Sequence, residues 1–252
     1  MTNLNETGER IAIVTGGGQG IGAGICRQLA AAGLRVVVAD IQADKASTVA
    51  TALGPHHASR AVDVSDETAV VQLFNDVEAN IGPVGVLVCA AGLLILPGGE
   101  RPMIVDMALD TWEKSFAVNT RGAFLCSREY LRRRTLQPVS QGRVIFFGSV
   151  AAQLGGYRAS AAYIGAKAAV MGYAKAFARE SAHLGITANA IAPGLIDTDM
   201  LRSTVSSSGA LTAAAQAIPL GRIGTVGDGA SAVSYLVSLS AAYVASLVME
   251  AN

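Results

Sequence analysis

Short apolar runs alternate with longer alanine-rich segments along the whole chain. The apolar runs are RIAIVT (10–15), RVVVAD (35–40), SRAVDV (59–64), VGVLVCA (84–90), RVIFFGS (143–149), TANAIA (187–192) and ASLVME (245–250). Helical patterns lie between them, near 22–32, 43–53, 66–80, 107–135, 158–184 and 228–239. Strands that are apolar throughout and separated by helices indicate a parallel sheet covered on both faces.

This alternation predicts an α/β protein with one doubly wound, Rossmann-type domain over residues 1–252. Its sheet should have seven parallel strands, with helices on both faces. The length of 252 residues suits a single domain of this kind. The segment 194–217 is too long for an ordinary connection, so we expect it to form a lid over the substrate.

The composition argues against a nucleic-acid-binding, metal-binding or membrane-spanning protein. The 19 basic and 19 acidic residues cancel, whereas a nucleic-acid surface needs an excess of clustered basic residues. The three cysteines are widely spaced in apolar stretches, which predicts no metal site, no disulfide and a cytoplasmic location. Two uncharged stretches, 81–99 and 229–249, are interrupted by proline and glycine or by serine, so we expect no membrane span.

The stretch TGGGQGIG (15–22) places five glycines where the first strand meets the first helix. Ligands of doubly wound sheets bind beyond the carboxyl ends of the strands. A helix start there offers unpaired N–H groups and a positive dipole end to a pyrophosphate, and glycine lets the backbone approach it. The pattern is T-G-x-x-x-G-x-G, with glycines at 16, 20 and 22. A glycine-rich turn without a ligand is the alternative.

Asp40 closes the second strand, where its carboxylate can accept hydrogen bonds from the adenosine ribose of a dinucleotide and would repel a 2′-phosphate. The alternative interpretation is a cap on the helix that begins near Ala43. Arg35 is expected at the far end of the strand and Lys45 beyond it, on the next helix. With no basic residue expected at the ribose, we predict that NAD(H) is preferred over NADP(H).

Three residues carry candidate chemistry. Tyr163 and Lys167 are four positions apart on a predicted helix, so their side chains share one face. An adjacent ammonium should lower the pKa of the phenol toward the range that general acid–base catalysis requires. Ser149 ends a strand at the same edge as the glycine loop, where its hydroxyl could bind a substrate oxygen.

These motifs together resemble the short-chain dehydrogenase/reductase family over nearly the whole chain. Further matches are DV (63–64), VN (118–119), GS (148–149), PG (193–194) and CAAG (89–92), where the family usually has NNAG. The CAAG variant lacks the asparagine side chains that brace this loop.

The resemblance implies that Tyr163 is the general acid/base and that Ser149 orients the substrate oxygen. Lys167 would bind the nicotinamide ribose and Asn119 would hold a water in a proton relay. Cofactor contacts are implied for Gly16, Gln19, Gly20, Ile21, Gly22, Asp40, Ile41, Asp63, Val64, Gly92, Tyr163, Lys167, Pro193, Gly194, Ile196 and Thr198. Gln19 stands where an NADP-preferring relative often carries a basic residue.

The substrate pocket is expected to include Ser149, Gln153, Tyr157, Leu195 and Leu201. This mostly apolar set favours an uncharged, hydrophobic ketone or secondary alcohol. The helices near 107–135 and 158–184 are apolar on several faces, and the family places its main subunit interface there, which predicts a homotetramer or at least a dimer.

Three functions remain open. The first is an NAD(H)-dependent oxidoreductase that interconverts a secondary alcohol and a ketone. The second is a 3-oxoacyl-thioester reductase, which NAIAPGLIDTDM and IPLGRIG also resemble and which more often uses NADPH and a basic patch for an acidic carrier protein. The third is a non-catalytic dinucleotide sensor, which could dispense with the acid–base residues that this chain retains.

Overall fold

The computed structural model describes residues 9–156, 159–204 and 208–252. In these ranges seven parallel strands form one sheet in the order β3-β2-β1-β4-β5-β6-β7. The strands are β1 (Ile11–Thr15), β2 (Arg35–Asp40), β3 (Ala58–Ala61), β4 (Val84–Cys89), β5 (Arg143–Phe147), β6 (Thr187–Pro193) and β7 (Val248–Ala251). The predicted doubly wound fold is confirmed.

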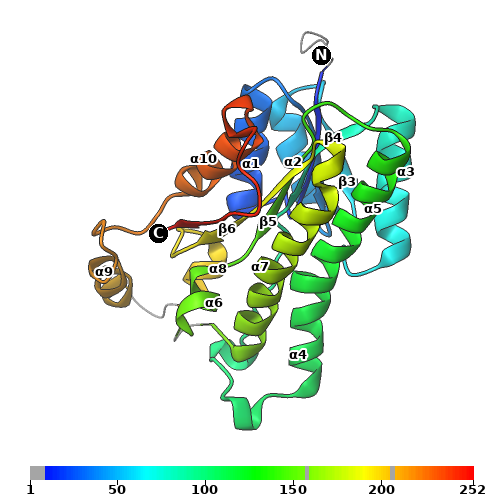
Figure 1. Ribbon diagram of the computed structural model, residues 1–252. Coiled ribbons are helices and arrows are strands. Elements are labelled where there is room, and N and C mark those ends of the chain that lie inside the picture. Colours follow the sequence, from blue (N-terminus) through cyan, green and yellow to red (C-terminus); the bar gives the residue numbers. More distant parts are fainter. Residues whose placement is uncertain (1–8, 157–158, 205–207) are drawn as a thin grey trace.

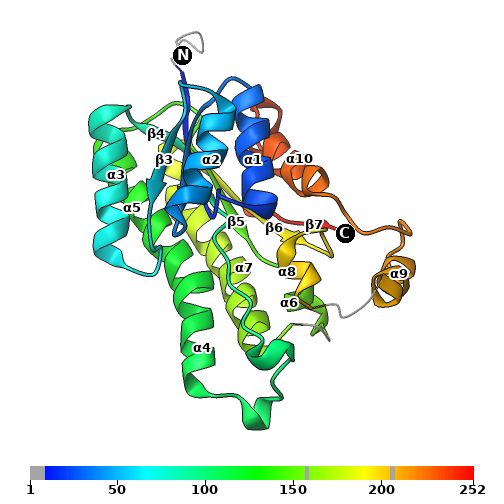
Figure 2. The same cartoon turned by 180° about the vertical axis from the view of Figure 1, so that it is seen from behind.

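Helices cover both faces of this sheet. Figure 1 shows one face with α3 (Glu67–Asn80), α5 (Gly122–Leu136) and α7 (Ala161–Ser181). Figure 2, from behind, shows the other face with α1 (Gly20–Ala31), α2 (Ala43–Leu53) and α10 (Val226–Val237). No helix within the described ranges is both long enough and apolar enough to cross a membrane.

Shorter elements lie outside the two helical layers. α4 (Leu109–Phe116) continues into α5 through a π-helical turn, Ala117–Arg121, and α4 extends beyond the sheet (Figure 1). Three short helices, α6 (Val150–Leu154), α8 (Asp199–Arg202) and α9 (Ser208–Gln216), follow the strands β5 and β6. Single 3-10 turns occupy Pro97–Gly99, Ile104–Asp106, Ala182–Leu184 and Leu239–Ala241.

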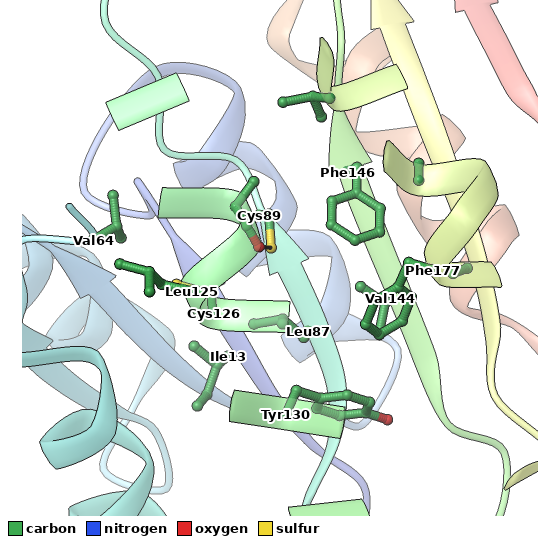
Figure 3. Close-up of a cluster of buried hydrophobic side chains, with 14 of the residues drawn as sticks. Ile13, Val64, Leu87, Cys89, Leu125, Cys126, Tyr130, Val144, Phe146 and Phe177 are labelled. Carbon is green, nitrogen blue, oxygen red and sulfur yellow. Dashed lines mark hydrogen bonds between the residues drawn. The ribbon is translucent and has the colours of Figure 1, made fainter. Parts of the chain in front are cut away.

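The alternation of side chains along each strand builds one core on each face. Ile11 and Ile13 belong to the cluster that α3, α5 and α7 complete, part of which is drawn in Figure 3. Ala12 and Val14 belong to the cluster completed by α1, α2 and α10. Both sides of β1 are therefore buried, which explains why its sequence is apolar without a polar alternation.

The observed elements depart from the sequence prediction in three places. The third strand ends at Ala61 rather than at 64, because Asp63 turns the chain by accepting hydrogen bonds from the N–H and hydroxyl of Ser65. The helix predicted near 107–135 is interrupted by the π-helical turn. The expected lid segment contains α8 and, in the described part from 208 onward, α9. Its function as a lid stays a prediction.

A buried ion pair joins α3 to α5. Glu78 pairs with Arg134, whose side chain is 1% exposed, and with Arg133 at 3.2 Å. Glu78 also accepts a 3.2 Å hydrogen bond from the N–H of Val84, the first residue of β4. Burial lowers the pKa of Arg134, and the Glu78 carboxylate opposes that shift. The Glu78 carboxylate thus balances the charge of the Arg134 guanidinium, which is buried away from water.

Glu78→Ala should lower the free energy of unfolding by about 3 kcal/mol, because it leaves the Arg134 guanidinium buried and unpaired. Urea unfolding followed by circular dichroism measures this change. Glu180→Ala, which removes an exposed glutamate of α7, is the control and should change stability by less than about 0.5 kcal/mol. Equal losses in the two variants would contradict the assigned role of Glu78.

Candidate active site

The glycine loop brings the start of α1 against the end of β1. Gly16 and Gly20 have φ angles of 67° and 52°, which favour glycine. A Cβ on Gly22 would lie 2.0 Å from the carbonyl oxygen of Gly16. Gln19, the N-cap, makes no capping bond with its side chain in the described structure. The first-turn N–H groups therefore face outward beyond β1, and this cradle fits the pyrophosphate of a dinucleotide.

Asp40 connects the glycine loop with the start of α2. Its side chain is buried, and one carboxylate oxygen accepts a 3.0 Å hydrogen bond from the N–H of Gly18. The other oxygen accepts a 3.0 Å bond from the N–H of Gln42, the N-cap residue of α2. Each oxygen has a second lone pair that a ribose hydroxyl could use. The capping contact is thus present, and the ribose contact stays a prediction.

Lys45, on the first turn of α2, contacts the glycine loop. Its Nζ donates a 2.5 Å hydrogen bond to Oε1 of Gln19, and its stem packs against Gly18 on the side of the Asp40 carboxylate. Lys45 is the third residue of α2, so it lies on the next helix as expected. Its distance from the ribose stays a prediction.

The segments that follow β3 and β4 are held by contacts with other elements. Val64 is buried in the core and packs against Gly122 at the start of α5. Thr15 accepts a 3.3 Å hydrogen bond from the N–H of Ala91 and donates a 3.3 Å bond to the carbonyl of Val88. Thr15 thus ties down the CAAG loop, in which the family's asparagines are absent.

Asn119 holds the end of the same loop from the π-helical turn. Its Nδ2 donates to the carbonyl of Leu93 at 2.8 Å and to the carbonyl of Ser115 at 2.9 Å, and its Oδ1 accepts from the N–H of Leu93 at 3.0 Å. The side chain is 2% exposed. The amide therefore positions the loop, and the expected relay water stays a prediction.

Lys167 and Asn119 meet at Gly92. A Cβ on Gly92 would lie 3.3 Å from the Asn119 Oδ1 and 3.4 Å from the Lys167 Nζ. The ammonium donates a 2.9 Å hydrogen bond to the carbonyl of Phe147, at the end of β5, and its side chain is buried. Burial lowers the pKa of Lys167 to about 8, so the amine is still mostly protonated at neutral pH.

Ser149, Tyr163 and Lys167 form one group. Ser149 is the N-cap of α6, where its hydroxyl accepts a 3.2 Å bond from the N–H of Ala151. The Ser149 hydroxyl lies near enough to the phenol of Tyr163 to affect its pKa, and the Lys167 Nζ lies 5.8 Å from the Tyr163 ring centre. Burial raises the pKa of Tyr163, and the Ser149 side chain lowers it in part. The net shift is opposite to the expected lowering, because desolvation of the phenol is the larger effect.

The chain after β6 completes the edge beside the glycine loop. The N–H of Gly194 bonds to the carbonyl of Ala251 at 2.9 Å. Ile196 is buried against Gly224. Thr198, the N-cap of α8, lies 3.5 Å from the position that a Cβ on Gly20 would take.

The residues expected around the substrate differ in their exposure. Gln153 is exposed on α6, Leu195 is half-buried, and Leu201 is buried with 7% of its surface exposed. Tyr157 lies outside the described residues. Ser149 lies near enough to Tyr163 to affect the pKa of its phenol.

Close contacts form a continuous line along the carboxyl edge of the sheet. Asp40 bonds to Gly18, Gly16 lies against Ala91, Gly92 lies against Asn119 and Lys167, and the Tyr163 phenol lies near Ser149. Cys26, Cys89 and Cys126 are free and buried, and the described residues contain no group of side chains suited to a metal ion.

Comparison with known proteins agrees with this arrangement. The family of short chain dehydrogenases matches residues 10–209. The chain belongs to this family. It is 32% identical over 243 residues to the 3-oxoacyl-[acyl-carrier-protein] reductase FabG of Escherichia coli, covering 96% of both chains. It is 37% identical over 251 residues to the 3-oxoacyl-[acyl-carrier-protein] reductase MabA of Mycobacterium tuberculosis, covering 95% of this chain and 90% of the relative.

The lowered pKa of Lys167 predicts a dependence of stability on pH. The folded chain releases this proton near pH 8, whereas an unfolded lysine holds it until about pH 10.4. The unfolded state therefore binds more protons between these values, and the contribution of Lys167 to stability rises with pH. Below pH 8 Lys167 is charged in the folded chain, so burial of its ammonium lowers the free energy of unfolding by the full amount.

Lys167→Met should stabilise the cofactor-free chain at pH 7 by about 2 kcal/mol. The variant no longer buries an ammonium, which is favourable, and it loses the hydrogen bond to Phe147, which offsets part of that gain. The gain should shrink between pH 8 and pH 10. Urea unfolding at several pH values measures both effects, with exposed Lys175→Met as the matched control. A Lys167→Met variant that is less stable than the wild type at pH 7 would refute the prediction.

Proposed function

We propose that this short-chain dehydrogenase interconverts a ketone and a secondary alcohol, with Tyr163 as the general acid/base. The observation that carries the proposal is the group formed by the Ser149 hydroxyl, the Tyr163 phenol and the Lys167 ammonium beside the glycine cradle. A non-catalytic dinucleotide sensor would not require this group. The buried cysteines fit a cytoplasmic enzyme, which we include in the proposal.

In this mechanism the ketone oxygen accepts hydrogen bonds from Ser149 and Tyr163. A bound nicotinamide dinucleotide supplies the hydride for reduction and accepts it in oxidation. Tyr163 donates its proton to the substrate oxygen as negative charge develops there, and Ser149 holds that oxygen in place. Lys167 stabilises the phenolate that remains. Oxidation of the alcohol uses the same contacts with the proton moving in the opposite direction.

NAD(H) is the proposed cofactor. Asp40 supports this choice because its buried carboxylate lies beside Gly18, where a 2′-phosphate would meet a negative charge. Ile41, which is 66% exposed, adds no charge there. Residues of the cradle, together with Asp40, Gly92 and Thr198, would hold the dinucleotide along the carboxyl edge.

A second candidate is a 3-oxoacyl-thioester reductase, which the names of the relatives favour. Its substrate is also a ketone, so the same three side chains would serve it. Absorbance at 340 nm should be followed with uncharged hydrophobic ketones and with acetoacetyl-coenzyme A, each with NADH and NADPH.

Faster turnover of the ketones with NADH supports the first candidate, and faster turnover of the thioester supports the second. Cofactor binding without turnover of either class would overturn both in favour of a sensor.

Tyr163→Phe should bind cofactor as the wild type does and lower kcat by ~10²–10⁴-fold, because the proton donor is lost while the ring remains. Dinucleotide affinity by fluorescence and kcat by absorbance measure the two properties separately. Tyr173→Phe, at a second tyrosine further along α7, is the matched control. A Tyr163→Phe enzyme with more than about a tenth of the wild-type rate would remove Tyr163 from this role.

A homotetramer, or at least a dimer, is also proposed. Trp112 and Phe124 are 41% and 38% exposed beside a groove of about 820 Å³ on α4 and α5. Ala169 belongs to the exposed surface of α7, in a run of small residues. Such surfaces suit close helix packing between subunits.

Light scattering at micromolar protein should give a multiple of the 25.7 kDa chain mass. Ala169→Arg should reduce that mass by placing a bulky charge in the interface, whereas Ala79→Arg, on an exposed position of α3, should leave it unchanged. A monomeric wild type would refute the proposal.

A further inference from the structure

Lys45 places a positive charge beside the carboxylate that is proposed to select the cofactor. Its Cβ would lie 3.0 Å from a Cβ on Gly18, and the Asp40 Oδ2 would lie 2.9 Å from the same point. The lysine stem and the carboxylate therefore lie side by side against one residue of the glycine loop. Both Lys45 and Gln19 are exposed, so the ammonium can leave Gln19 for a ligand without uncovering a buried group.

We propose that Lys45 is a specificity-determining residue that binds the 2′-phosphate of NADP(H) and limits the preference of this site for NAD(H). The proposal rests on the proposed function, in which Asp40 lies at the adenosine ribose. Asp40 repels a 2′-phosphate, and Lys45 attracts it from the same side of Gly18. With NAD(H) bound, Lys45 remains on Gln19 and contributes little.

The contact between Lys45 and Gln19 supports this role. Gln19, the N-cap of α1, carries no charge, so the loop itself offers a 2′-phosphate no basic side chain. The 2.5 Å bond brings the Lys45 ammonium to the Gln19 amide at the start of α1. Lys45 of α2 thus places a positive charge beside Gln19, which is itself uncharged.

Two nucleotide fragments test the proposal without any catalysis. Adenosine 2′,5′-bisphosphate carries the 2′-phosphate of NADP, and adenosine 5′-monophosphate lacks it. Their dissociation constants should be measured by calorimetry for the wild type, Lys45→Met, Asp40→Ser and the double variant. Lys45→Met keeps the stem on Gly18 and removes the charge, and Lys175→Met is the charge-matched control on α7.

Lys45→Met should weaken binding of the bisphosphate about tenfold and leave binding of the monophosphate within about twofold, because a hydrogen bond to a charged group is lost with the first ligand alone. Asp40→Ser should strengthen binding of the bisphosphate, and the double variant should lose that gain. The effect of Lys45 should decrease as salt is raised.

Equal losses for both fragments would assign Lys45 to general nucleotide binding and overturn the proposal. An unchanged ratio of the two affinities in both Asp40 backgrounds would also overturn it. If the wild type binds the bisphosphate too weakly to measure, the Asp40→Ser background decides the outcome. A wild type that prefers NADP(H) would refute the NAD(H) assignment, but the comparison of Lys45→Met with its parent would still test Lys45.

Discussion

The close approach of Gly22 to Gly16 is the contact on which the site depends. Because a Cβ on Gly22 would lie 2.0 Å from the Gly16 oxygen, any side chain there would push α1 away from the end of β1. A displaced α1 would no longer present its first N–H groups beyond the sheet. The same displacement would move Gly18 from Asp40 and Gly20 from Thr198. The glycines therefore position both sides of the cradle as well as admitting a ligand.

The sequence predicts most of this arrangement because the determining signals are local. Each strand is an apolar run, and parallel pairing brings the ends of successive strands to one edge, which places Asp40 and Ser149 along it. The spacing of Tyr163 and Lys167 fixes one helix face irrespective of tertiary contacts. These features follow from periodicity and topology, which a single sequence contains.

Other features depend on contacts between distant segments. Lys45 reaches Gln19 across the loop, and nothing in the helical pattern of α2 specifies that reach. Because CAAG replaces NNAG, the sequence indicated that the loop after β4 lacks the hydrogen bonds of the asparagine side chains. In the structure Thr15 of β1 and Asn119 of the π-helical turn hold this loop by hydrogen bonds to it. The four- and five-residue helices α8 and α6 are too short to produce a clear period.

The electrostatics of the catalytic group show how burial competes with charge. Desolvation raises the pKa of Tyr163, so the chain without a ligand holds this residue as a phenol, the form that can donate a proton to a ketone. The Lys167 ammonium bonds to the carbonyl of Phe147, and its own pKa falls because it is buried. In the proposed mechanism, oxidation of an alcohol needs a phenolate, which requires Lys167 to stay charged at a cost to folding stability. On that proposal the group suits reduction at neutral pH, and oxidation should gain from a higher pH only until Lys167 loses its proton.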